Sequence, residues 1–434
     1  MVRYFPDTSE LDRPSRRRVL TALVAGAGIP LAGCVDDATS SNDDSSSAGD
    51  DSAGGDVASD DTETDSAGRD DPFEVETVVD GANHPWGLAF LPDDGRLLVT
   101  ERAGALLIVD RESVDRTTDD GAVETVPGTP AVHAVGQGGL LDVAVDPAYP
   151  ADQWVYLTYV ATNDAGESTT HVGRGRLDPD APELTEFETL HAAEPFVDSN
   201  GHYGSRVIVG RDGALYVTVG DRQNKEFGPE HVSQDATNEL GTTLRLHRDG
   251  SIPEDNPFVD DPDVADAIYS YGHRNAQGMT IHPETGEIWQ SEHGERDGDE
   301  ITVVERGGNH GWPIAHYGCA YGTDDPVGDE PHERDDTVDP VYYWECGSGG
   351  FPPSGATFYD GEAFSEWDGD LFIGNLAGRY LGRFRVDGHD VTEVDPLLDG
   401  RDWRIRDVAV GPDEGHLYVA VDDVDAPVVR LTPE

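Results

Sequence analysis

The sequence predicts an all-β chain that folds as a six-bladed β-propeller, preceded by an export segment and an acidic linker. A short sequence motif recurs six times after residue 72. It consists of a turn rich in Asp, Gly or Pro followed by an apolar strand. Apolar patterns of helical period are hard to find there, which disfavours α/β folds. The first 71 residues differ sharply in composition from the rest, so we expect them to lie outside this fold.

Residues 1–34 have the features of a secretory signal. Arginines at 16–18 precede an apolar, small-residue run at 19–32 that is too short for a comfortable membrane span. The paired arginines favour the twin-arginine route, and Cys34 after Leu-Ala-Gly resembles a lipobox cysteine, which is lipidated. We therefore expect export and anchoring on the outer face of the cell membrane through Cys34. A buried apolar helix with an incidental cysteine is the alternative.

Residues 35–71 form the predicted linker. They are almost entirely Asp, Ser, Gly, Thr, Ala and Glu, and such a segment cannot bury enough apolar surface to offset the entropy of ordering. Ser and Gly make it flexible, and its charge extends it. We expect a disordered acidic tether in front of a folded domain at 72–434.

The chain is strongly acidic. It has 29 Lys and Arg against 88 Asp and Glu, a formal charge of −59, and its only lysine is Lys225. At molar salt the screening length falls to about 3 Å, so this self-repulsion fades. The composition predicts a halophilic protein and argues against nucleic acid as a partner. An acidic disordered protein is excluded because Val, Leu, Tyr, Trp and Gly are spread through the same region.

The repeated turn-and-strand motif defines six predicted blades. Its strands begin at Leu97, Trp154, Leu215, Ile288, Leu371 and Leu417. Spacings of roughly 45 to 85 residues suit four-stranded blades with variable loops. Turns of Gly and Asp that lead into β-branched and aromatic strands are hairpin signals. A pair of β-sandwiches is the structural alternative.

Three cysteines occur in the sequence. If Cys34 is the lipid anchor, Cys319 and Cys346 remain. They could pair outside the cell, where disulfides persist. Two buried free thiols fit the spacing almost as well, so both states stay open.

Candidate site residues stand in five clusters beside glycines, as expected for loops that converge on a propeller channel. The clusters are 136–142 (GQGGLLD), 201–206 (GHYGSR) with 220–222 (GDR), 271–275 (YGHRN), 292–300 (EHGERDGDE) and 403–407 (WRIRD). In this order they resemble the PQQ-dependent soluble glucose/sorbosone dehydrogenases and the related aldose sugar dehydrogenases. The stretches 85–90 (PWGLAF), 271–278 (YGHRNAQG) and 307–313 (GGNHGWP) are the most specific, and the resemblance covers essentially the whole exported domain.

The resemblance implies an enzyme that oxidises aldose sugars at C1 to lactones and passes electrons through PQQ to an external acceptor. It makes His202 the general base that takes the proton of the anomeric hydroxyl, a task that suits an imidazole. It makes Asp221 the carboxylate that holds the tautomer of this histidine. Gln137 matches a substrate-facing amide.

The family's cofactor clamp matches Arg274, Asn275, Arg404 and Arg406. PQQ carries three carboxylates on a planar ring, and guanidinium groups bind carboxylates in bidentate fashion and stack on flat rings. The simpler interpretation is that each arginine pairs with a neighbouring carboxylate such as Asp407.

The resemblance also implies calcium, a cation that prefers hard oxygen ligands. The ion that polarises the quinone carbonyl would bind the backbone carbonyls of Gly294 and Glu295. A second, structural calcium would involve Glu300 and the backbone of His310. Without the family, 292–300 would be an acidic loop in an acidic protein.

The chain departs from the family at two places. The loss of a lysine at the first, a residue that the aldose dehydrogenases also lack, would weaken PQQ binding unless another group compensates, and the second leaves the sugar undefined. Asp360 stands where the glucose-specific members are expected to place a lysine on the cofactor, and the stretch 346–351 also differs. Two other functions compete with the dehydrogenase. A calcium-dependent lactonase would not require the arginines near the carboxyl end, because a lactone is neutral. A non-catalytic propeller that binds glycans or proteins would be expected to have lost some of the site residues.

Overall fold

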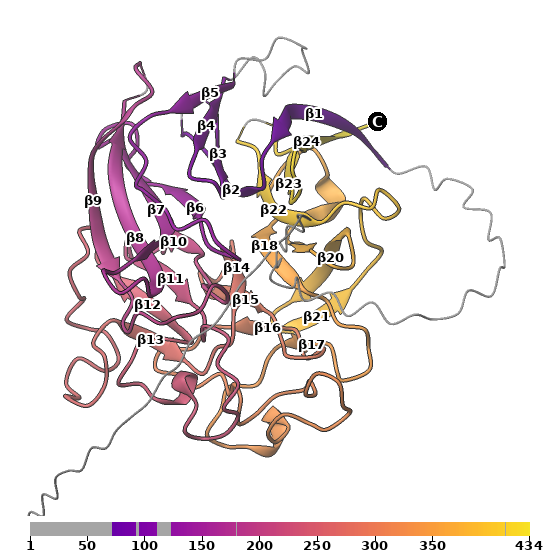
Figure 1. Cartoon of the computed structure of the whole chain (residues 1–434). Coiled ribbons are helices and arrows are strands. Elements are labelled where there is room, and N and C mark those ends of the chain that lie inside the picture. The colour runs from indigo at the N-terminus through magenta and orange to yellow at the C-terminus, as the bar shows by residue number, and fades with distance from the viewer. Residues whose placement is uncertain (1–71, 93–94, 111–122, 179, 413) are drawn as a thin grey trace, which may run out of the picture. The chain divides into compact units, whose positions relative to one another are not determined.

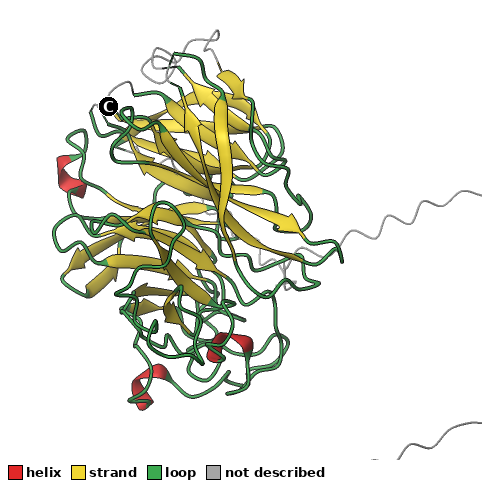
Figure 2. Ribbon diagram, turned by 90° about the vertical axis from the view of Figure 1, so that its left-hand side faces the viewer, coloured by secondary structure: helices red, strands yellow, loops and turns green. Residues whose placement is uncertain are grey.

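The computed structural model describes residues 72–434 except 93–94, 111–122, 179 and 413. In this part of the chain six antiparallel four-stranded sheets surround a common channel, which confirms the predicted six-bladed β-propeller (Figure 1). Helix is limited there to three single-turn segments, η1 (Val232–Gln234), η2 (Pro331–Glu333) and η3 (Ser365–Trp367) (Figure 2). None of the described helices has the length and apolarity needed to cross a bilayer. The expected signal, lipobox and tether lie outside the described residues.

Blades 1 to 5 each pair four consecutive strands in sequence order. Blade 1 contains β2 (Pro85–Phe90), β3 (Leu97–Glu101), β4 (Leu106–Val109) and β5 (Val123–Val126). Blade 2 contains β6 (Leu140–Val145), β7 (Trp154–Thr162), β8 (Ser168–Leu177) and β9 (Leu184–Ala192). Blade 3 contains β10 (Val207–Val209), β11 (Leu215–Val219), β12 (Thr242–Leu246) and β13 (Ile268–Tyr271). Blade 4 contains β14 (Ala276–Ile281), β15 (Ile288–Glu292), β16 (Glu300–Val303) and β17 (Tyr342–Tyr343). Blade 5 contains β18 (Pro353–Phe358), β19 (Leu371–Asn375), β20 (Tyr380–Asp387) and β21 (Asp390–Glu393).

Blade 6 closes the ring with strands from both ends of the described chain. It contains β22 (Ile405–Val410), β23 (Leu417–Val421), β24 (Ala426–Pro433) and β1 (Phe73–Ala82). Strand β1 pairs antiparallel with β24, with Phe73 opposite Pro433, so it forms the outer edge of this blade (Figure 1). The pairing ties the two ends together and completes the propeller.

The six strands predicted from the repeated motif are the second strands of the six blades. They are β3, β7, β11, β15, β19 and β23. Blade 3 shows why the phrase folds this way. The carboxylate of Asp212 accepts a hydrogen bond from Ala214 N (3.0 Å), and Gly213 takes a positive φ of 80°. These are the properties of a tight turn, and the apolar strand β11 that follows is buried along its whole length.

The first strand of each blade lines the channel, because these strands contact the first strands of the neighbouring blades. Arg206 ties them together in the middle of the channel. Its Nη1 lies 3.1 Å from carboxylate oxygens of both Asp142 and Asp407, and its guanidinium carbon lies 4.1 Å from the ring of Trp86. These four side chains belong to four different blades and are all buried.

Strand direction decides which loops share one end of the channel. In an antiparallel hairpin, the start of the first strand lies beside the end of the second strand. Residues that precede first strands therefore gather with residues that follow second strands. We call this end of the channel the upper end.

Candidate active site

The predicted site residues come together at the upper end, from four blades. Gln137 precedes β6, His202 precedes β10, Arg274 and Asn275 precede β14, Asp221 and Gly294 follow β11 and β15, and Arg404 and Arg406 stand at the start of β22. The predicted calcium residues Glu295, Glu300 and His310 belong to the same end, because Glu300 pairs with Glu292 and His310 N bonds to Tyr271 O. Residues far apart in sequence thus share one region.

His202 and Asp221 form a buried hydrogen-bonded pair. Nδ1 of His202 lies 2.7 Å from Oδ1 of Asp221. The carboxylate also accepts hydrogen bonds from Gln223 N (2.9 Å) and Trp312 Nε1 (2.9 Å). His202 has a positive φ of 47°, a strained conformation that persists only when its surroundings fix it. The structure therefore supplies the geometry of an oriented histidine.

The electrostatics of the pair favour a neutral imidazole. Burial, followed by the charge of Arg274, lowers the pKa of His202. Burial raises the pKa of Asp221, but the charge of His202 and the hydrogen bond to it outweigh this, so its pKa is lowered. An ionised Asp221 keeps the ring proton on Nδ1 of His202. Nε2 is then the nitrogen that carries a lone pair.

Gln137 and Asn275 both hold the loop that carries His202. Oε1 of Gln137 accepts a hydrogen bond from His202 N (2.8 Å), and Oδ1 of Asn275 accepts one from Gly204 N (3.0 Å). The side chain of Gln137 remains exposed, whereas Asn275 is buried. Their predicted contacts with substrate and cofactor are additional to this supporting role.

Arg274 lies in a group of three charged residues that we call the Arg274 cluster, made of Arg274, Glu295 and Lys225. Arg274 Nη2 donates to Glu295 Oε2 (2.8 Å), and Lys225 Nζ lies 2.6 and 2.7 Å from the two oxygens of the same carboxylate. The guanidinium carbon of Arg274 lies 5.3 Å from the ring of Trp312. The side chain of Glu295 thus serves two cations, apart from any use of its backbone carbonyl.

A second group, the Arg406 cluster, consists of Arg406, Arg404 and Asp422. Arg406 Nη2 pairs with Oδ2 of Asp422, and Arg404 Nη2 lies 3.7 Å from the same oxygen. Burial opposes ionisation of Asp422, but the charge of Arg406 and the bond from His84 (2.9 Å) hold its pKa far below the usual range. The two arginines therefore pair with Asp422 and not with Asp407, the neighbour considered from the sequence. Asp407 pairs with Arg206 instead.

Several buried polar atoms at the upper end have no hydrogen-bond partner. Among the described residues nine buried side-chain nitrogen or oxygen atoms are unpartnered, and they include Arg274 Nε, Arg406 Nε and His293 Nε2. Burial and the charge of Arg274 hold the pKa of His293 well below its usual value. Two unused guanidinium donors and a neutral imidazole fit an anionic ligand that supplies acceptors here.

The loop that was predicted to bind calcium is tightly packed. A Cβ on Gly294 would lie 2.0 Å from Asp297 O, and Gly294 N donates to Asp299 Oδ1 (2.9 Å). Burial, with the charges of Glu292 and Asp299, raises the pKa of Glu300 well above its usual value. The described residues contain no group of three His, Cys, Asp or Glu side chains arranged to hold a metal.

His310 lies against His273, with ring centroids 4.5 Å apart, and its Nδ1 lies 3.0 Å from Thr302 Oγ1. Its Nε2 is one of the unpartnered buried atoms. The predicted role of His310 concerns its backbone carbonyl, so these side-chain contacts leave that role a prediction.

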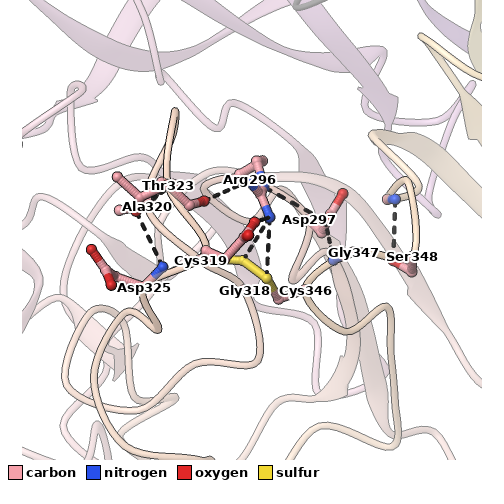
Figure 3. The surroundings of a disulfide bond; sticks show 12 residues. Arg296, Asp297, Gly318, Cys319, Ala320, Thr323, Asp325, Cys346, Gly347 and Ser348 are labelled. Atoms are coloured by element: carbon pink, nitrogen blue, oxygen red, sulfur yellow. Dashed lines mark hydrogen bonds and ion pairs between the residues drawn. A yellow bond between two sulfur atoms is a disulfide. The ribbon is translucent and has the colours of Figure 1, made fainter. Parts of the chain in front are cut away.

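A disulfide joins Cys319 and Cys346, with Cα atoms 5.6 Å apart, which answers the question that the spacing left open. Figure 3 shows Arg296 beside it, donating from Nη2 to Sγ of Cys319 (3.2 Å) and of Cys346 (3.3 Å). Asp297 accepts from Gly347 N (2.6 Å). Because Arg296 follows Glu295 directly, the crosslink lies beside the loop that carries Glu295 of the Arg274 cluster.

Three residues of the site were missed from the sequence: Lys225, His293 and Asp422. Lys225 had a signal, since it is the only lysine in the chain. His293 stood inside a recognised cluster without a role. Asp422 had no signal, because one Asp among many acidic residues is not distinctive.

Asp360 lies away from the upper end. It follows Phe358, the last residue of the first strand β18, so it lies at the other end of blade 5. The position compared with the glucose-type lysine therefore does not face the arginine clusters. The presence of Asp instead of Lys at position 360 therefore does not change the number of cations at the upper end.

At the mouth of this propeller channel an oriented histidine and two arginine clusters offer a proton acceptor and donors for an anionic ligand. The chain belongs to the glucose/sorbosone dehydrogenase family, whose model matches residues 82–430. It is an oxidoreductase of this family. Membership favours the dehydrogenase over the lactonase and the non-catalytic propeller.

Two relatives and one solved structure with sugar dehydrogenase names show this similarity. It is 36% identical over 359 residues to aldose sugar dehydrogenase YliI of Escherichia coli, covering 83% of this chain and 92% of the relative. It is 28% identical over 422 residues to quinoprotein glucose dehydrogenase B of Acinetobacter calcoaceticus, covering 81% and 85%. The PQQ-bound structure of aldose sugar dehydrogenase from Streptomyces coelicolor matches with a TM-score of 0.65 and 27% identity, covering 83% of this chain and 98% of that one.

Proposed function

We propose that this protein oxidises aldose sugars at C1 to lactones with PQQ as its cofactor and an external electron acceptor. The observation that carries the proposal is the buried His202–Asp221 pair beside two clusters with unused guanidinium donors. The names of the relatives support the sugar substrate and the cofactor. The reaction removes a hydride from C1 and a proton from the hydroxyl on C1.

His202 takes the hydroxyl proton at Nε2. Its lowered pKa keeps the ring neutral at neutral pH, so the base is in its active form. Asp221 holds the other ring nitrogen and stabilises the imidazolium that forms. Gln137 fixes the backbone of the base through His202 N and presents its exposed amide toward substrate.

Arg274, Asn275, Arg404 and Arg406 would hold the cofactor. Guanidinium groups bind carboxylates through paired N–H donors, and unpartnered Nε atoms on Arg274 and Arg406 fit this use. When bound, PQQ supplies the acceptor for the hydride. The residues of this chain orient the sugar and move the proton.

Calcium completes the proposed site. Backbone carbonyls of Gly294 and Glu295 would hold one ion beside the cofactor, and Glu300 with the carbonyl of His310 would hold a structural ion. The burial of Glu300 close to other carboxylates supports a cation there, because buried charge is unfavourable unless paired.

We also propose export and anchoring through a lipidated Cys34 and use at high salt. The disulfide between Cys319 and Cys346 supports an oxidising compartment. The formal charge of −59 supports function where salt screens repulsion.

Dye-linked aldose oxidation by the purified full chain tests the function. The assay is run in molar salt with Ca²⁺, with and without PQQ. Dye reduction that requires PQQ and sugar is the expected result. Absence of activity, together with an unchanged PQQ absorption spectrum on mixing, would contradict the proposal.

A further inference from the structure

The two charged clusters at the upper end have the same composition. Each contains a buried carboxylate, Glu295 or Asp422, and a buried arginine. Each also contains one cation that reaches the surface, the exposed Lys225 (53% of its side chain) or the partly exposed Arg404 (33%). Lys225 thus occupies in the Arg274 cluster the place that Arg404 occupies in the Arg406 cluster.

The charges show what Lys225 contributes. Arg274 and Glu295 alone cancel, whereas Lys225 gives the cluster a net charge of +1. Arg404 does the same for Arg406 and Asp422. Within a chain of formal charge −59, a positive cluster needs this second cation if it is to attract an anion.

The ammonium of Lys225 is placed to reach a ligand. It has three N–H donors, and the two oxygens of Glu295 engage two of them. Its Nζ lies 5.8 Å from the ring of Phe227 and 5.5 Å from the ring of Tyr321, and both residues are exposed. The loop that carries Lys225 starts directly after Asp221, which is the hydrogen-bond partner of the proposed base His202.

We propose that Lys225 is a ligand-binding residue that, together with Arg274, binds one carboxylate of PQQ. The inference rests on the proposed function, because it takes PQQ as the ligand. The carboxylate of an acidic sugar has the same chemistry, and the experiment separates the two. The inference also supplies the cation that position 360 does not.

Because Lys225 is the only lysine, amine acylation labels a single side chain in the full-length protein. We would treat the protein with acetyl N-hydroxysuccinimide ester and follow the Lys225 peptide by mass spectrometry, with an added free-amine peptide as internal reference. Saturating PQQ is expected to slow acylation of Lys225 about tenfold without affecting the reference. Glucuronate alone is expected to leave it unchanged. Equal labelling with and without PQQ, or protection by glucuronate alone, would overturn the inference.

Binding titrations give an independent test. Lys225→Met should weaken PQQ binding about tenfold in an absorbance titration, and Lys225→Arg should restore most of it. Arg211→Met is the matched control, because Arg211 is a cation in the β10–β11 turn of the same blade, at the other end of the channel. Wild-type affinity in Lys225→Met would overturn the inference. PQQ-dependent dye reduction by the unaltered protein would then still stand, so the two proposals fail separately.

Discussion

Asp221→Asn tests the proposed base without removing it. The change keeps the size of the side chain and deletes its charge. Asp221 accepts hydrogen bonds from His202 Nδ1 (2.7 Å), Gln223 N (2.9 Å) and Trp312 Nε1 (2.9 Å). An amide has one oxygen and one nitrogen, so no orientation satisfies all three donors.

Each orientation has a calculable cost. If the amide oxygen faces His202, its nitrogen opposes Trp312 Nε1, and the imidazolium that forms in the reaction loses an ionised hydrogen-bond partner, a bond worth about 1.5–3 kcal/mol. That corresponds to about 10- to 150-fold in rate. If the amide nitrogen faces His202, the ring proton moves to Nε2 and the base is blocked, an error that costs about 10⁴-fold in the serine protease triad. We expect kcat to fall by about 10- to 10⁴-fold.

The assay is dye-linked aldose oxidation with saturating PQQ and Ca²⁺, with PQQ affinity measured by absorbance titration in parallel. Asp221→Asn should lower kcat and leave PQQ affinity within about twofold, since the Asp221 carboxylate bonds no side chain of the predicted clamp. The bond from Asp221 N to Arg274 O (2.8 Å) joins backbone atoms, so the substitution leaves it in place. Asp212→Asn is the control. It changes a turn carboxylate on the same blade at the other end, where it bonds Ala214 N (3.0 Å). A parental kcat in Asp221→Asn, or a loss of kcat matched by loss of PQQ binding, would refute the reasoning.

Three further predictions follow from the site. Activity should rise with pH as His202 loses its proton, and the midpoint of the kcat/KM profile should lie below 6.5. The reason is that burial, Arg274 and Lys225 lower the pKa of His202 more than Asp221 raises it. A midpoint above 6.5 would contradict this. Arg404→Ala should weaken PQQ binding about tenfold in an absorbance titration and leave the melting temperature unchanged, because Arg404 is partly exposed; unchanged affinity would remove it from the clamp. Cys346→Ser opens a disulfide with a sequence separation of 27, so the free energy of unfolding should fall by about 3–4 kcal/mol. For a domain of this size the melting temperature in a calorimetric scan should fall by about 5 °C. Reductant should not change the melting temperature of the variant.

Local patterns were enough to predict the architecture. The turn-and-strand motif identified one strand in every blade. A tight turn of Asp and Gly followed by an apolar strand depends only on residues close together in the sequence. The closure of blade 6 was not predicted. Strand β1 pairs with β24 across almost the whole domain, and no local pattern records that pairing.

The residue types of the site were also readable from the sequence. His202, Asp221, Arg274, Asn275, Arg404 and Arg406 all meet at the upper end, as the motif clusters indicated. The ion-pair partners of the arginines could not be predicted from the sequence. Arg406 selects Asp422, which follows the adjacent strand β23, over its sequence neighbour Asp407. The reason is that successive strand residues point to opposite faces, so sequence neighbours need not meet.

The sequence by itself determined the all-β propeller, the acidic surface chemistry and the set of polar residues available at the channel mouth. Only the tertiary structure decided which charges share a carboxylate, that Cys319 and Cys346 are joined, and that Lys225 lies beside Arg274 while Asp360 lies at the far end. Those outcomes depend on how strands from different blades align around the channel, and that alignment is fixed by packing and long-range pairing rather than by any short stretch of the chain.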